Sequence, residues 1–196
     1  MPPFQDIPIP PASIYANDPR VCANPTGDIM VVDTGGGEYS TITDRAWHVL
    51  SNTNHSSLMS GYQSEHEQVL SVVNAVTKAY IERRDEPVLF VMHYATLVVD
   101  ENEKESLHVP FQSMRHGIKF DLTPKIHGGK CNMAIEQEDF PIKFDGEKIF
   151  FTIEKPAQEE LDHYDCYELT SEAEMSKIWE QRVRRKSKKT THEGIP

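Results

Sequence analysis

Cysteine is scarce in this chain of 196 residues, and the three that occur, Cys22, Cys131 and Cys166, lie far apart. None belongs to a C-x-x-C pair, so the sequence lacks both the disulfide framework of a small secreted domain and the spacing of a zinc finger. We expect free thiols in a reducing compartment, which places the protein inside the cell, in the cytoplasm or the nucleus. Long apolar runs and a signal-peptide pattern are also missing, so no membrane contact is expected.

Basic residues are in the minority, with 20 Lys and Arg against 31 Asp and Glu and a net charge of −11. Many of the basic residues are concentrated in one run, from Arg182 to Lys189, which leaves the rest of the chain more acidic still. An acidic body repels phosphate backbones, so its folded part is not expected to bind nucleic acid. The run from Arg182 to Lys189 is the expected contact for nucleic acid or an import receptor, with a solvated linker as the alternative.

The length allows one domain of ordinary size and excludes two large lobes. A cluster of prolines predicts an extended arm over residues 1–19, because proline lacks a backbone donor and restrains the residue before it. We place the domain at residues 20–155, where the apolar residues concentrate. An acidic, then basic, tail or linker is expected over residues 156–196, and both extensions are expected to be flexible.

Apolar runs between turn signals predict a mostly β domain. Residues 69–81 and 88–99, joined by a polar turn, are expected to form a long hairpin, and Asp145-Gly146 predicts another. Trp47 and Phe90 are expected in the core. The other expected strands cover residues 28–33, 58–62, 118–121, 132–135, 140–144 and 148–153, and the expected helical segments cover residues 44–50, 109–116 and 172–185.

The first apolar run ends in Asp33-Thr34-Gly35, which is followed by Gly36. A strand that delivers an Asp-Thr-Gly turn suits a catalytic dyad, in which two carboxylates share one proton because both cannot be ionised together. No second Asp-Ser/Thr-Gly tripeptide occurs in the chain. The dyad therefore requires a homodimer in which each chain supplies Asp33. We expect the Thr34 hydroxyl to tie the two turns together and the small glycines to permit their approach.

Other interpretations of these residues remain open. Asp33 is also a residue type that shapes ordinary turns. The same glycine-rich segment is typical of the phosphate loop of actin-like and Hsp70-like ATPases, but that fold needs two lobes and a second loop. His127 with Cys131, and His163 with Cys166, have spacings that a metal can use, yet a zinc site needs four ligands. We therefore expect neither a metal nor a cofactor.

Further segments follow the tripeptide in an order that resembles the protease region of copia-like retrotransposon polyproteins. The resemblance spans about residues 28–155. One family feature has no counterpart near Val109-Pro110, namely the apolar pair followed by glycine that braces the catalytic turn. The segments that carry the resemblance are Val32-Asp33-Thr34-Gly35, Ala46-Trp47-His48-Val49-Leu50, Met59-Ser60-Gly61-Tyr62, His108-Val109-Pro110-Phe111-Gln112, Gly117-Ile118-Lys119-Phe120-Asp121 and His127-Gly128-Gly129.

The resemblance implies a small retropepsin-like closed β-barrel with one short helix. It also implies an aspartic endopeptidase that acts as a homodimer on polypeptide substrates, among them its own polyprotein. The flap over the substrate would be either the turn after Gly61 or the turn over residues 82–87. The competing hypothesis is a catalytically silent, retroelement-derived domain that serves dimerisation or interaction. An exposed Asp33 favours the protease, whereas a buried Asp33 with all its hydrogen bonds satisfied favours the silent domain.

Overall fold

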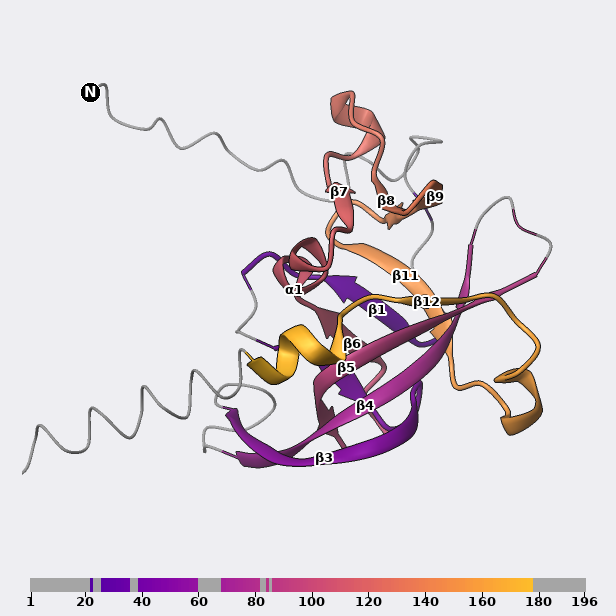
Figure 1. The fold of residues 1–196 in the computed structure, drawn as a ribbon. Coiled ribbons are helices and arrows are strands. Elements are labelled where there is room, and N and C mark those ends of the chain that lie inside the picture. Colours follow the sequence, from indigo (N-terminus) through magenta and orange to yellow (C-terminus); the bar gives the residue numbers. More distant parts are fainter. Residues whose placement is uncertain are drawn as a thin grey trace, which may run out of the picture.

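Six strands form a closed β-barrel in the computed structural model, which describes residues 22, 26–35, 39–59, 68–81, 84 and 86–177. Around the barrel the order is β11, β1, β6, β2, β5 and β4, and β4 pairs with β11 to close the ring (Figure 1). The predicted mostly β fold with a closed barrel is confirmed. The six strands are β1 (Ile29–Val32), β2 (Thr41–Thr43), β4 (Gln68–Tyr80), β5 (Val88–Val98), β6 (Glu105–His108) and β11 (Ile149–Glu154).

The remaining strands lie outside this ring. Three of them extend it: β3 (His48–Met59) pairs with β4, β10 (Lys143–Phe144) with β11, and β12 (Cys166–Glu168) with β5. A separate three-stranded sheet consists of β7 (Lys119–Asp121), β8 (Asn132–Ile135) and β9 (Glu138–Pro141). The helical elements are α1 (Pro110–Arg115), the 3-10 turns η2 (Lys125–His127) and η3 (Gln158–Glu160), and a helix over residues 172–177. The described part of the chain thus has two short helices, whereas the resemblance implied one.

The barrel core contains the large aromatic side chains. Trp47 and Phe90 are fully buried, as predicted. The Phe90 ring meets the rings of Phe140 and Phe151 edge to face, with centroids 5.7 Å apart in both pairs. Because Phe140 belongs to β9, the three-stranded sheet shares its core with the barrel.

The predicted hairpin of β4 and β5 is present and is apolar on both faces. Its inward residues, such as Phe90, join the main core. On the outward face, Val76, Leu89 and Val91 form a second buried cluster. A strand that is buried on both faces reads as a continuous apolar run, so something must cover this outward face.

Residues 157–177 pack on the barrel, although the sequence predicted a tail or linker from residue 156. Leu161 and Tyr164 cover the outward cluster, and β12 pairs in parallel with β5 as its neighbour in the sheet (Figure 1). Leu169 is fully buried and Met175 is 2% exposed. The acidic composition hid this packing, because only a few apolar residues in the segment make the contacts.

The helical segment predicted over residues 44–50 is wrong. Residues 44–46 form a turn, and β3 begins at His48. Its polar sequence gave no strand signal, since one edge of β3 pairs with β4 and most of its side chains are exposed. Register shifts after Val49 and Asn52 also break the alternation that would have revealed it.

Some expectations fall outside the described residues. These are the arm over residues 1–19, the turn after Gly61, most of the turn over residues 82–87, the part of the expected helix beyond residue 177, and the run from Arg182 to Lys189. Within the ranges that the structure does describe, no helix has both the length and the apolar character that crossing a membrane requires.

Replacing Met175 with Ala is expected to lower the free energy of unfolding by about 2–3 kcal/mol, because the buried side chain leaves a cavity against Val72 and Tyr94. Denaturant titration measures the change. Met114→Ala is the matched control, since Met114 is 49% exposed and its loss should cost less than about 0.5 kcal/mol. Equal losses in both variants would show that residues 172–177 do not pack on the barrel in solution.

Candidate functional site

Asp33 directly follows the last residue of strand β1, at one end of the barrel. The strand lies between β11, which is antiparallel to it, and β6, which is parallel. Met30 and Val32 enter the core and hold β1 in place. The Asp33 backbone N–H donates to the His108 carbonyl at 2.9 Å, which continues the pairing with β6 one residue beyond the strand.

The Asp33 carboxylate is oriented by the turn that follows it. The Gly35 N–H donates to Asp33 Oδ1 at 2.8 Å, a local bond that aspartate often makes two residues ahead. Within the described part of the chain, Asp33 Oδ2 has no hydrogen-bond partner. Asp33 is half-buried, whereas Thr34 and Gly35 are exposed. The site thus presents a carboxylate with one fixed oxygen and one available oxygen.

Thr34, Gly35 and Gly36 were predicted to support the catalytic turn, and the structure describes only the first two of them. A Cβ on Gly35 would lie 3.5 Å from Asp33 Oδ1, an ordinary contact, so the described residues of the same chain leave room for a side chain there. Gly36 lies outside the described residues. The role of Thr34 as a tie between two turns requires a second chain and stays a prediction.

A buried polar cluster next to the strand end that pairs with Asp33 was missed by the sequence analysis. It consists of Ser40, His108, Gln112 and Ser113, and each of these residues is at most 6% exposed. The cluster joins the beginning of β2 to the end of β6 and to α1. It lies beside Val109-Pro110, where the sequence lacks the apolar pair and glycine. No local pattern in the sequence marks these residues, because Ser40 follows a polar, glycine-rich stretch and lies far from the other three along the chain.

His108 is the buried titratable group of this cluster. Its ring nitrogens face Ser40 Oγ at 3.4 Å and Ser113 Oγ at 3.1 Å, and its ring centroid is 5.8 Å from that of Phe120. Burial lowers the pKa of His108 from 6.5 to about 4, because the charged imidazolium would lose its hydration there. His108 is therefore neutral at pH 7.

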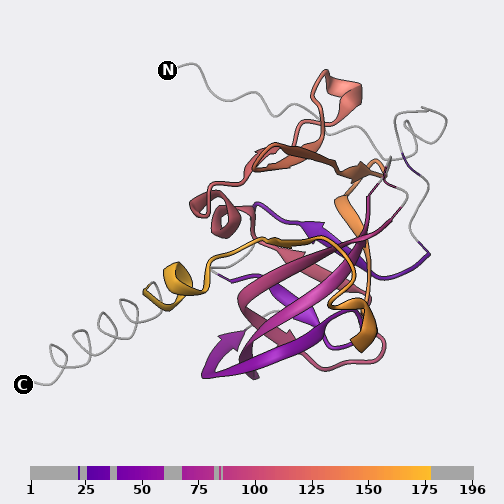
Figure 2. The ribbon, with the colours of Figure 1, turned by 45° about the vertical axis from the view of Figure 1, so that its right-hand side comes forward.

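The helix over residues 172–177 packs close to the chain segment that leads into β2. Met175 belongs to the same buried cluster as Tyr39, which directly precedes Ser40. Asn74 on β4 donates to Glu172 at 3.2 Å and accepts the Tyr94 N–H at 3.1 Å. In Figure 2 this helix extends from the barrel on the side where β1 ends.

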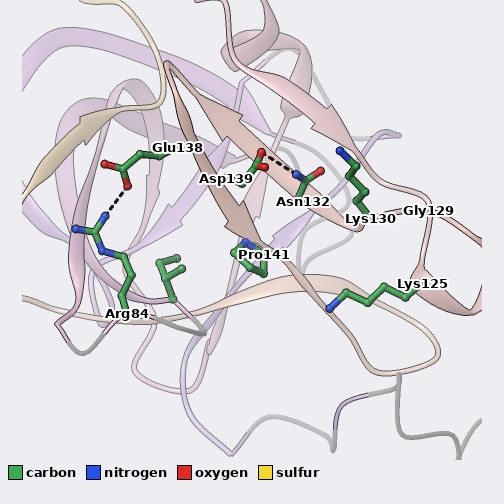
Figure 3. Close-up of a pocket in the computed structure, with 9 residues that line it drawn as sticks. Arg84, Lys125, Gly129, Lys130, Asn132, Glu138, Asp139 and Pro141 are labelled. Carbon is green, nitrogen blue, oxygen red and sulfur yellow. Dashed lines mark hydrogen bonds and ion pairs between the residues drawn. The ribbon is translucent and has the colours of Figure 1, made fainter.

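The pocket of Figure 3 lies elsewhere, between the turn that joins β4 to β5 and the three-stranded sheet, and has a volume of about 610 Å³. Arg84 pairs there with Glu138 at 2.6 Å, and Asn132 donates to Asp139 at 3.0 Å. Asp33 is not among the lining residues. The residues that line it are Ile81, Arg84, Lys125, Gly129, Lys130, Asn132, Glu138, Asp139 and Pro141.

The cysteines are free thiols, as predicted. Burial raises the pKa of Cys131 to about 11, which leaves its thiol protonated and a poor metal ligand at pH 7. Among the residues that the structure describes, no group of three or more His, Cys, Asp or Glu side chains is placed to hold a metal ion.

Comparisons with protein-family models, with curated proteins and with solved structures give no match for this chain.

Proposed function

We propose that this chain is an aspartic endopeptidase that works as a homodimer. The observation that carries the proposal is the half-exposed Asp33 at the end of a barrel strand, with its carboxylate oriented by the Gly35 N–H. Asp33 belongs to the chain's single Asp-Thr-Gly tripeptide, so a two-carboxylate site needs a second copy. The closed barrel supplies a rigid support for the turn.

Gly35 adds support for the homodimer. The described residues of its own chain leave space for a Cβ at Gly35, so the absence of a side chain has no steric cause there. A close approach from another chain would require such a bare, exposed backbone. The partner's turn, related by a two-fold axis, is the approach that a shared proton between two Asp33 carboxylates demands.

The reaction follows from the shared proton. The ionised Asp33 carboxylate takes a proton from a water molecule, whose oxygen attacks the scissile carbonyl carbon, while the protonated carboxyl donates to the carbonyl oxygen. The tetrahedral intermediate then collapses and the C–N bond breaks. The departing nitrogen takes the proton that the first carboxylate received from water, and the second carboxylate recovers its proton from the former carbonyl oxygen, so the dyad again holds one proton. The products are a carboxylate and an amine. No cofactor enters these steps.

The dependence of cleavage on protein concentration tests the homodimer. Each monomer holds half a site, so the rate should rise with the square of total chain concentration below the dimer dissociation constant, and linearly above it. A fluorogenic peptide library at mildly acidic pH gives the rates, and sedimentation equilibrium gives the dissociation constant. A rate that is linear at concentrations far below that constant would reject the shared site. An absence of cleavage at every concentration would favour the silent interaction domain.

A further inference from the structure

The connection between β1 and β2 is held at both ends by one element, the end of β6 together with α1. At its start, the Asp33 N–H donates to the His108 carbonyl at 2.9 Å. At its end, the Ser40 hydroxyl and the Ser40 N–H both donate to Gln112 Oε1, at 2.6 and 2.9 Å. Asp33 and Ser40 are therefore fixed to the same short stretch, residues 108–112.

The chemistry of the donors fixes the hydrogens in this cluster. Gln112 must present its oxygen to Ser40, because the Ser40 N–H can only donate. The hydroxyl proton of Ser40 is given to Gln112, so Ser40 Oγ accepts from the Val109 N–H at 3.0 Å and from Nδ1 of His108. His108 Nε2 is then the unprotonated nitrogen and accepts from Ser113 Oγ at 3.1 Å.

This arrangement is rigid because it is buried. Ser40 and His108 are fully buried, so any donor or acceptor that loses its partner cannot turn to water instead. Shifting Ser40 would leave the Val109 N–H and Gln112 Oε1 without this partner at once. The cluster therefore has one favourable geometry, which fixes the backbone at both ends of the connection between β1 and β2.

We propose that Ser40, His108 and Gln112 are positioning residues that set the orientation of the Asp33 carboxylate. They act through the backbone on either side of the turn and do not touch the reacting atoms. The catalytic consequence rests on the proposed protease function. The geometric consequence, a fixed bond from the Gly35 N–H to Asp33 Oδ1, does not.

Ser40→Ala tests the proposal, with Ser106→Ala as its matched control. Ser106 is also fully buried, lies on β6, and accepts from Trp47 Nε1 at 3.0 Å, but it bonds neither Ser40 nor the Asp33 turn. Both variants lose one buried hydroxyl. We expect Ser40→Ala to lower kcat about 10-fold to 100-fold with little change in KM, and Ser106→Ala to leave both constants within about twofold of wild type.

The Gly35 amide gives a readout that needs no activity. In Ser40→Ala its NMR shift should move, and its hydrogen-exchange protection should fall about tenfold, while Ser106→Ala leaves both unchanged. Ser113→Ala, which removes only the partner of His108 Nε2, should change the amide in the same direction by less, and it serves if Ser40→Ala does not fold. A Gly35 amide that is unchanged in these variants, or equally changed in Ser106→Ala, would overturn the proposal. If the wild type cleaves no peptide, the protease function is rejected. The NMR shift and hydrogen exchange of the Gly35 amide still test whether the cluster orients the Asp33 carboxylate.

Discussion

Replacing Asp33 with Asn is expected to abolish peptide cleavage and to leave the dimer folded. The amide keeps the shape of the carboxylate and its Oδ1 acceptor for the Gly35 N–H, so the turn should persist. It cannot take a proton from water, and two amides cannot share a proton as two carboxylates do. We expect a fall in kcat of at least about 10⁴-fold, from the loss of the base and of the shared proton together.

Asp100→Asn is the matched control for this experiment. Asp100 is also half-buried and accepts an N–H two residues ahead, from Asn102 at 2.9 Å. Its substitution should change neither cleavage nor oligomeric state. Sedimentation and denaturant unfolding on both variants establish that they remain folded dimers. Cleavage by purified Asp33→Asn at more than about a tenth of the wild-type rate would exclude Asp33 as the catalytic carboxylate.

The free energy of unfolding is expected to fall by about 3 kcal/mol between pH 7 and pH 4 through His108 alone. The buried imidazole keeps a pKa of about 4 in the folded chain, against 6.5 for the unfolded chain. At a pH between these two pKa values, His108 binds a proton in the unfolded state but not in the folded state. Its contribution is therefore fully present above about pH 6.5 and is lost as the pH falls toward 4.

Denaturant titration at several pH values measures this loss. His108→Gln should flatten the pH dependence by about 3 kcal/mol, whatever its cost at pH 7. His163→Gln, at an exposed histidine, is the matched control for the substitution itself. An unaltered slope in His108→Gln would mean that His108 titrates normally in the folded state. Because the proposed dyad needs mild acidity, the acid limit of cleavage is expected to follow the unfolding of this cluster.

Local signals account for the elements that the sequence predicted correctly. The helix α1 begins with Pro110, which suits the first turn of a helix, and Gly117 follows it with a φ of +90° that few other residues adopt. Gly146, with a φ of +104°, turns the chain between β10 and β11. Each of these signals acts within a few residues, so the local sequence is enough to predict the element.

Long-range pairing explains what the sequence analysis missed. Residues 44–50 looked helical in isolation, but β4 provides an edge for β3 there. Residues 157–177 looked like a linker, but Leu161 and Tyr164 pack on the outward face of the β4–β5 hairpin. The polar cluster is assembled in the same way, because Ser40 and Gln112 are 72 residues apart.

The amino-acid order thus dictated where β1 ends and that an aspartate follows it, since both depend on an apolar run and the turn chemistry of Asp33-Thr34-Gly35. Folding in three dimensions dictated what surrounds that aspartate. The parallel neighbour β6, the closure of β11 onto β4, and the cluster around His108 each join segments distant in the chain. Such contacts leave no local pattern, because their stability comes from burial and hydrogen bonds that exist only once the barrel has closed.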